Sequence, residues 1–183
     1  MIGNDIIDLA FAEAESNWQR KGFLEKQFTP KEQATILEAE NSFITVWTLW
    51  SMKEAAYKIW VQQNQERIFA PIKFECEVVS EDEGIVHFQK EKYYTKTKVN
   101  TSLIHTIGFL EKTAQVYTSI GSVGEIDKRL KKKLQKETGF PVSEIKQKKT
   151  KSGAPNYFYM EKALTKSCSI SHHGNYGAFV YEY

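Results

Sequence analysis

Hydrophobic and polar residues recur with two different periods along the chain. In the first third, apolar residues lie three and four positions apart, which predicts helices over residues 10–20, 29–40 and 42–63. Later the period falls to two, which is typical of strands. Strands are expected within residues 1–8, and at 72–78, 85–88, 93–99, 103–110, 116–120, 155–160, 167–171 and 176–183, with one more helix from Val123 to Thr138.

Two helices carry strong local signals. Thr29 is a helix-capping residue, Pro30 suits the first turn and Glu32 stands three residues after the cap. In the helix at 42–63, four aromatic residues recur at spacings of three, seven and three, so we expect their stripe to face the core. These residues are Trp47, Trp50, Tyr57 and Trp60.

The order of elements predicts an α+β fold with antiparallel sheets and packed helices. The strands between residues 72 and 120 are separated by short polar turns, which indicates an antiparallel meander. A second helix-then-strands unit follows, in which Ile126, Leu130 and Leu134 share one face of the helix and lysines crowd the other. No Pro- or Ser-rich linker separates the two parts, so we expect them to pack as one body.

Composition narrows the class of protein. The 183 residues are 41% hydrophobic and 13% aromatic, which supports a packed core and excludes a disordered chain. Cys76 and Cys168 have neither metal-ligand spacing nor the number that a disulfide framework needs, so a reducing compartment is expected. The beginning of the chain lacks a secretory leader, and no apolar run reaches membrane-spanning length. We therefore expect a cytoplasmic protein without a membrane partner.

Positive charge is concentrated in one segment, although the net charge is only +2. Residues 128–151 hold ten Lys or Arg against two Glu. Such a run is usually a solvated surface, and it would also suit an acidic protein partner. A nucleic-acid site would need interleaved arginines or aromatic residues, and Arg129 is the single arginine of the segment. Nucleic acid is therefore disfavoured as a partner.

Polar residues at two places are candidates for chemistry. Asp5 stands among apolar residues of the first strand, where a carboxylate needs a cation or several donors. Glu54 and Lys58 form an i, i+4 pair that could simply decorate a helix surface. If Asp5 and Glu54 converge, their oxygens would suit Mg²⁺, which takes one or two carboxylates and completes its shell with water and phosphate.

The segment Ser169-Ile-Ser-His172 places hydroxyls and an imidazole at the end of a strand. Gly174 in the following turn would permit close approach of a ligand. An ordinary Ser- and His-containing hairpin turn explains the same residues equally well. Of His172 and His173, we expect only one to face a site.

Three segments together resemble the 4'-phosphopantetheinyl transferase superfamily, which includes the holo-acyl-carrier-protein synthases and the larger Sfp-like members. They are Gly3-Asn-Asp5, Trp50-Ser-Met-Lys53-Glu54-Ala-Ala-Tyr-Lys58 and Ser169-Ile-Ser-His172. The resemblance implies that Asp5 and Glu54 hold Mg²⁺ against the pyrophosphate of coenzyme A. It also implies that Lys53 and Lys58, and then Ser171 and His172, contact this co-substrate.

The resemblance covers nearly the whole chain, in an unusual order. In the larger members, the segment that resembles residues 128–183 precedes the Gly-x-Asp strand, whereas here it follows. This order implies a permuted pseudodimer, with a metal-binding half at 1–122 and a second half at 123–183. Such a chain need not trimerise to complete its site, and both a monomer and a trimer stay open.

The sequence departs from the family at two positions. A third acid often stands two residues after the Asp, and here that position is Ile7. The family's Gly-Lys-Pro turn reads Gly153-Ala-Pro155, which removes one phosphate contact, and Lys149 or Lys151 is a candidate replacement.

The activity that the resemblance implies is holo-acyl-carrier-protein synthase activity, as in fatty acid biosynthesis. A serine of an apo acyl carrier protein would attack coenzyme A with Glu54 as the base and Lys58 offsetting charge, and the lysine-rich helix would attract the acidic carrier. The alternatives are a catalytically degenerate module that binds coenzyme A or a carrier protein, and a small nucleic-acid-binding domain.

Overall fold

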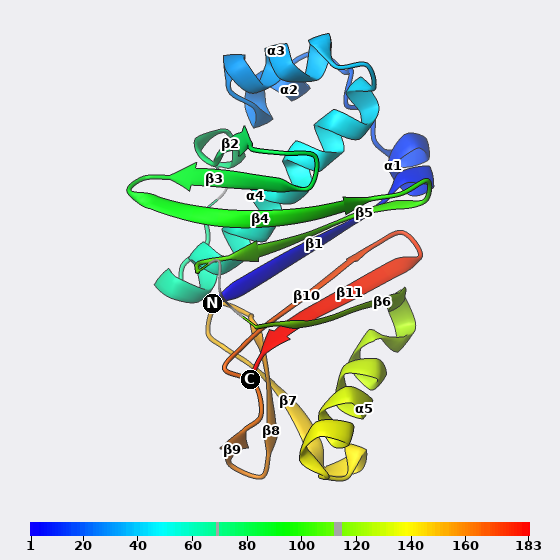
Figure 1. The fold of residues 1–183 in the computed structure, drawn as a ribbon, viewed down its shortest axis with the longest axis vertical. Coiled ribbons are helices and arrows are strands. Elements are labelled where there is room, and N and C mark those ends of the chain that lie inside the picture. Colours follow the sequence, from blue (N-terminus) through cyan, green and yellow to red (C-terminus); the bar gives the residue numbers. More distant parts are fainter. Residues whose placement is uncertain (69, 112–114) are drawn as a thin grey trace.

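A five-stranded antiparallel sheet with the strand order β1-β5-β4-β3-β2 forms the larger half of the protein (Figure 1). The computed structural model describes residues 1–68, 70–111 and 115–183. The helices are α1 (Leu9–Glu15), α2 (Phe23–Gln27), α3 (Pro30–Glu38), α4 (Ser42–Asn64) and α5 (Ile126–Thr138), with 3₁₀ turns at Pro71–Lys73, Val123–Glu125 and Val142–Glu144. The strands are β1 (Ile2–Asp8), β2 (Glu75–Val78), β3 (Glu83–Phe88), β4 (Glu91–Val99), β5 (Leu103–Phe109), β6 (Tyr117–Ser122), β7 (Ile145–Lys149), β8 (Pro155–Tyr159), β9 (Lys162–Ala163), β10 (Ser167–His173) and β11 (Tyr176–Glu182).

Helix α4 covers one face of this sheet, and α3 packs against α4. The predicted capping box is present, because Thr29 Oγ1 accepts from Glu32 N at 3.3 Å and Glu32 Oε2 accepts from Thr29 N at 2.7 Å. Trp47 and Trp60 are buried in the core, the first against Phe23 of α2 and the second against Phe88 of β3, whereas Trp50 and Tyr57 are half-buried and pack against the same cluster. The aromatic stripe is therefore confirmed as core.

Small residues let α4 lie against β1 and β5 at close range. Gly3 and Gly108 are direct partners in the β1–β5 ladder, and both face Ala55 of α4. A Cβ at Gly3 would overlap the Ala55 carbonyl oxygen. This close approach places the middle of α4 directly over β1.

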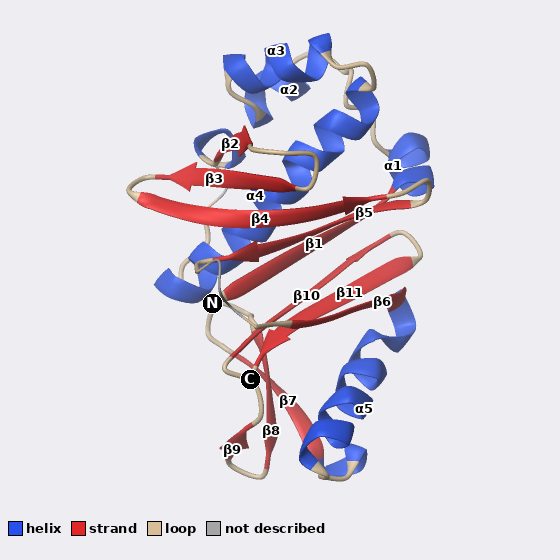
Figure 2. Ribbon diagram, viewed as in Figure 1, coloured by secondary structure: helices blue, strands red, loops and turns tan. Residues whose placement is uncertain are grey.

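The smaller half contains a second antiparallel sheet, with the order β10-β11-β6, and helix α5 on one of its faces (Figure 2). Ile126, Leu130 and Leu134 are buried against this sheet, which confirms the predicted apolar face of α5. Gly139 ends the helix in the left-handed conformation, with φ +78. A third small sheet, β7-β8-β9, completes this half.

The two halves share a strand connectivity. In the larger half, β1 pairs with β5, which pairs with β4; in the smaller half, β6 pairs with β11, which pairs with β10. Each half therefore opens with a strand that joins its own last strand. Because β6 pairs with β11, it belongs to the smaller half. The division between the halves therefore lies before Tyr117 and not after residue 122, where the sequence predicted it.

Side chains join the two halves where edge strand β1 runs parallel to edge strand β10. The N–H groups of Ile2 and Asn4 donate to Ser167 Oγ and Ser169 Oγ, both at 3.1 Å, and Asp8 N donates to His173 Nδ1 at 3.0 Å. Asn4 Nδ2 adds a bond to Ser171 Oγ at 2.9 Å. We call this set, Ser167, Ser169, Ser171 and His173 with their β1 partners, the β1–β10 seam.

Three sequence-based expectations about elements were wrong. The helix predicted over 10–20 ends at Glu15, because the Asn17 side chain forms a local turn and Gly22 adopts φ +80 before α2. The strand predicted from Ile72 begins at Glu75, since Pro71 starts a 3₁₀ turn. Strand β6 does not continue the meander but pairs with β11.

Within the described part of the chain, none of the helices combines the length with the apolar character required to cross a membrane.

Candidate active site

Asp5 and Lys58 meet where α4 crosses β1. Lys58 Nζ donates to the Asn4 carbonyl at 2.6 Å and to Asp5 Oδ1 at 3.3 Å. One helical turn further on, Gln62 Nε2 donates to the Ile2 carbonyl at 2.7 Å. Because β1 is an edge strand, α4 side chains satisfy carbonyl groups that no neighbouring strand could reach.

The Asp5 carboxylate is buried and only partly satisfied. Lys58 bonds one oxygen, whereas Oδ2 makes no hydrogen bond of regular geometry to any described residue. The Ser51 hydroxyl lies close enough to Asp5 to lower its pKa, without regular hydrogen-bond geometry. Burial raises the pKa of Asp5, and the adjacent Lys58 charge opposes that rise. The site therefore holds a carboxylate oxygen that is free to accept a cation.

Glu54 lies within electrostatic reach of Asp5, one helical turn before Lys58. Burial, with a smaller contribution from the negative charge of Asp5, raises the pKa of Glu54 to about 7, although the positive charge of Lys58 opposes the rise. Two buried carboxylates this close to one another form a site for positive charge, and one lysine does not neutralise both.

This pair fits a magnesium ion better than a metal that needs several protein ligands. The described residues contain no group of three or more His, Cys, Asp and Glu that could hold a metal. Ile7, at the position where a third acid was considered, is buried in the core on the α4 side. Two carboxylates, one with an unpaired buried oxygen, suit Mg²⁺, whose remaining ligands are commonly water and substrate phosphates.

A cleft of about 250 Å³ opens beside Glu54 and Lys58. Its walls come from α4, from the start of β10 and from the loop at residues 152–155. The lining residues are Glu54, Tyr57, Lys58, Val61, Gln62, Arg67, Ser152, Gly153, Ala154, Pro155, Cys168, Ser169 and Ile170. The cleft therefore joins the carboxylate pair to the junction between the two halves.

The cation beside the Gly153-Ala-Pro155 turn is Arg67. Lys149 and Lys151 were the candidates to replace the phosphate contact of the family's Gly-Lys-Pro turn. Neither is among the described residues that line the cleft, whereas Arg67 is. Its Nε and Nη2 donate to Ser152 O at 3.0 and 2.7 Å. Arg67 lies outside every motif considered in the sequence, and only its position in space reveals it.

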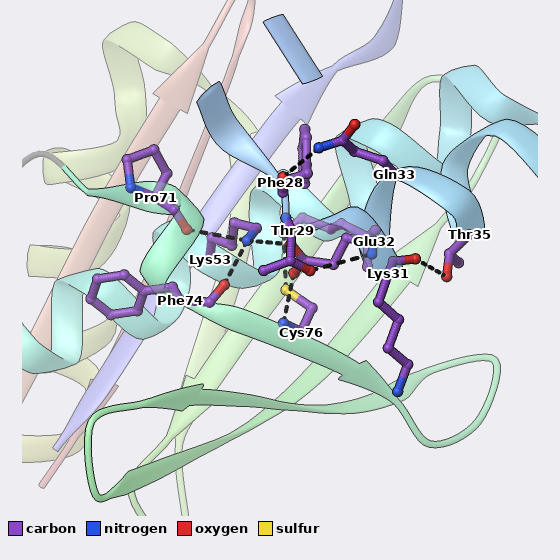
Figure 3. Close-up of polar contacts among 11 residues, drawn as sticks. Phe28, Thr29, Lys31, Glu32, Gln33, Thr35, Lys53, Pro71, Phe74 and Cys76 are labelled. Atoms are coloured by element: carbon purple, nitrogen blue, oxygen red, sulfur yellow. Dashed lines mark hydrogen bonds and ion pairs between the residues drawn. The ribbon is translucent and has the colours of Figure 1, made fainter. Parts of the chain in front are cut away.

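Lys53 does not join this cluster. Its ammonium group is buried and donates to Glu32 Oε2 at 2.9 Å, to Pro71 O at 3.1 Å and to Phe74 O at 2.6 Å (Figure 3). An ammonium group has three donors, so none remains for a ligand. The expectation that Lys53 contacts the co-substrate is corrected: the residue ties α4 to α3 and to the start of β2.

Glu32 completes this buried network from the capping box. Its Oε2 accepts from both Thr29 N and Lys53, and its Oε1 accepts from Cys76 N at 2.7 Å (Figure 3). With both oxygens bonded, the buried ion pair is fully satisfied. The first lysine of the α4 motif therefore stabilises the orientation of the helix that carries Glu54 and Lys58.

Ser171 and His172 lie further along β10 than the part that lines the cleft. Ser171 is buried in the β1–β10 seam, and His172 is exposed. The close approach that Gly174 permits is made by Asp8, whose carboxylate would overlap a Cβ there. Contact of Ser171 and His172 with a nucleotide stays a prediction.

Comparison with protein families decides the relationship. A family model described as the 4'-phosphopantetheinyl transferase superfamily matches residues 1–114. The matched region contains Asp5, Glu54 and Lys58. The chain belongs to this superfamily. A search of curated proteins returned no match to the chain.

Membership of the 4'-phosphopantetheinyl transferase superfamily supports a transferase that moves phosphopantetheine, with coenzyme A and a carrier protein as partners and typically a divalent metal. The matched residues end before β6, so the second half lies outside the match. In this superfamily member, the cleft beside the carboxylate pair is lined by α4 in the matched region and by residues 152–155 and 168–170 outside it.

Proposed function

We propose that the protein transfers 4'-phosphopantetheine from coenzyme A to a serine hydroxyl of an apo acyl carrier protein. The observation that carries this proposal is the buried Asp5 carboxylate, with its unpaired Oδ2, beside Glu54 and Lys58 at the cleft. A buried carboxylate oxygen that lacks a partner is costly, and a site for a metal ion and a pyrophosphate accounts for the cost.

Asp5 and Glu54 would hold Mg²⁺. When bound, the ion supplies positive charge that offsets the negative charge of the pyrophosphate oxygens. Lys58, already fixed between Asn4 O and Asp5, is placed to bind phosphate oxygen with its remaining donor.

Transfer forms one bond and breaks one bond. The serine oxygen attacks the phosphorus that bears the pantetheine, and the bond from this phosphorus to the bridging oxygen of the pyrophosphate breaks. The electron pair leaves on adenosine 3',5'-bisphosphate, and Lys58 offsets the charge that develops there. Glu54 is the residue that we assign to accept the serine proton, directly or through a water molecule, because it is the cleft carboxylate beside Lys58.

The carrier protein would dock at the basic helix α5. Lys131 and Lys133 form ion pairs with Asp127 and Glu137 within the helix. Lys133 also lines a shallow groove between α5 and β6, together with Arg129, Lys132 and Lys136, which form no ion pair with any described residue. A row of cations suits an acidic carrier, which electrostatic attraction would steer to this face.

We also infer that the chain is a pseudodimer with its site between the halves. The shared connectivity of β1-β5-β4 and β6-β11-β10 supports this inference, and it favours a division ahead of β6. A monomer would then contain a whole site. A cytoplasmic location agrees with Cys76 and Cys168, which are both free thiols.

The deciding experiment measures the intact mass of an apo acyl carrier protein after incubation with the protein, coenzyme A and Mg²⁺. We expect a gain of one phosphopantetheinyl group that is lost with EDTA and reduced at least about 100-fold in rate by Glu54→Gln. The double variant Lys132→Glu and Lys136→Glu should slow transfer to the carrier, and unchanged transfer would contradict docking at α5. Binding of coenzyme A without transfer to any carrier tested would instead identify a degenerate binding module.

A further inference from the structure

Arg67 is a cation of the cleft that carries no assigned role. It follows α4, and its guanidinium reaches the loop at 152–155. Two of its five N–H donors are used on the Ser152 carbonyl, so three remain. Gly153 adopts φ +91, and a Cβ there would overlap Nη2 of Arg67. The backbone of the loop therefore leaves room for this guanidinium.

Within the described part of the chain, Arg67 has no carboxylate at ion-pair distance. A carbonyl oxygen accepts its hydrogen bonds without cancelling the positive charge. Arg67 is also exposed, so a ligand in the cleft could reach it. An arginine held at its Nε edge, with donors left over, is suited to binding phosphate.

The two cations of the cleft lining are held by different parts of the fold. Lys58 is bound to Asp5 and to β1, next to the carboxylate pair, whereas Arg67 is bound to the 152–155 loop of the second half. Coenzyme A likewise carries phosphate at two places, a pyrophosphate and a monoester on the 3'-oxygen of its ribose. If the pyrophosphate lies at the carboxylates and Lys58, the phosphate left for the second cation is the monoester.

We propose that Arg67 binds the 3'-phosphate of coenzyme A and makes the protein select coenzyme A over 3'-dephospho-coenzyme A. This inference rests on the proposed function, which supplies the identity of the ligand. It adds a residue that determines specificity and that lies between the two halves.

A purely structural role for Arg67 makes a different prediction. If its guanidinium only fixes the 152–155 loop, its loss would weaken binding of both nucleotides to the same extent. Gln65→Ala is the matched control for this role, because Gln65 Oε1 accepts from Ser152 N at 3.3 Å and so helps to hold the same loop. Lys149→Gln is the control for loss of a nearby positive charge, since Lys149 ends β7 at the base of the loop and does not line the cleft.

The test is calorimetric titration of the wild type and the three variants with coenzyme A and, separately, with 3'-dephospho-coenzyme A, which needs no turnover. We expect the wild type to bind coenzyme A about 10- to 100-fold more tightly than the dephospho form, the range for a hydrogen-bonded charge pair. Arg67→Gln should weaken binding of coenzyme A until its affinity is close to that of 3'-dephospho-coenzyme A, whose own affinity stays nearly unchanged. Both control variants should still bind coenzyme A more tightly than the dephospho form.

Three results would overturn the inference: no preference in the wild type, a preference that survives in Arg67→Gln, or equal weakening of both ligands by Arg67→Gln. Preference for coenzyme A without any transfer to a carrier would refute the proposed transferase activity and leave the role of Arg67 intact. Failure of the wild type to bind either nucleotide would refute both.

Discussion

Glu54 combines two properties that follow from its surroundings, a raised proton affinity and a place beside a second carboxylate. Near neutral pH the apo protein holds a proton on Glu54 in a substantial fraction of molecules, because the pKa is about 7. A divalent cation must displace that proton to bind both carboxylates. Protonation and metal binding at this residue therefore compete.

We predict that Mn²⁺, as a probe for Mg²⁺, binds more weakly as the pH falls below 7, by up to about tenfold per pH unit for one displaced proton. Above pH 8 the affinity should level off, since Glu54 is then ionised without metal. Titrations followed by electron paramagnetic resonance at pH 6, 7 and 8 would measure this. Glu54→Gln should bind weakly at each pH, and an affinity in the wild type that does not vary with pH would contradict the assignment.

At the scale of elements, the position of Glu54 and Lys58 depends on how closely α4 approaches β1. Gly3 and Gly108 leave the space that the Ala55 backbone fills. A side chain at position 3 would displace the helix, and with it the two charged residues that face Asp5.

We predict that Gly3→Ala lowers the free energy of unfolding by about 1–3 kcal/mol, the usual cost of overpacking, and that it also weakens Mn²⁺ binding. Urea unfolding and the same metal titration would measure the two effects. Gly124→Ala is the matched control, because a Cβ at Gly124 would meet nothing within 4 Å and the residue has no positive φ. Equal stability of the two variants would show that the close approach is not required.

Local patterns identified the elements whose signals lie within a few residues. The capping box of Thr29 and Glu32 was visible in the sequence, as was the spacing of Ile126, Leu130 and Leu134. Strand β7 was missed because its lysines and glutamine show little apolar alternation, and the sheet to which β6 belongs depends on a partner more than fifty residues away. Pairing of distant strands leaves no trace in a local period.

The same limit applies to the candidate site: residues within a local motif were predictable, and contacts between distant segments were not. Asp5, Glu54 and Lys58 lie close together, as the motifs indicated, and their roles in metal and phosphate binding stay predictions. Lys53 was misplaced, since a helix motif does not reveal that Glu32, in a separate helix, takes the ammonium group. Arg67 was missed for the opposite reason: its partner Ser152 is remote in sequence, and no periodicity includes it.

At the scale of the whole molecule, His105 lies in the contact between the two halves. It is buried on the face of β5 whose neighbours Leu103 and Ile107 pack against the second sheet. Burial, together with the positive charges of Lys58 and Lys98, lowers the pKa of His105 to about 4. The imidazole is therefore neutral in the folded protein at neutral pH.

We predict that the free energy of unfolding falls as the pH drops from 6.5 to 4. In this range His105 binds a proton in the unfolded chain and stays neutral in the folded protein. The stabilising contribution is complete above pH 6.5 and amounts to about 3 kcal/mol, from a shift of roughly 2.5 pKa units. Urea unfolding at pH 7.5 and 4.5 measures how much the free energy of unfolding changes between these two pH values. This change should be smaller in His105→Gln than in the wild type or in His172→Gln, a control variant at an exposed residue. An unchanged difference would exclude His105 as its source.

The β1–β10 seam has a consequence for how the two halves align. Its partners are side chains at every second residue of β10, and they meet N–H groups at even-numbered residues of β1. A shift by one residue would turn Cys168 and Ile170 toward β1 and remove every acceptor at once, while a shift by two would move β10 by about 6.6 Å. The two halves can therefore align only in steps of two residues, and the spacing of the serines fixes where β10, which forms one wall of the cleft, lies along β1.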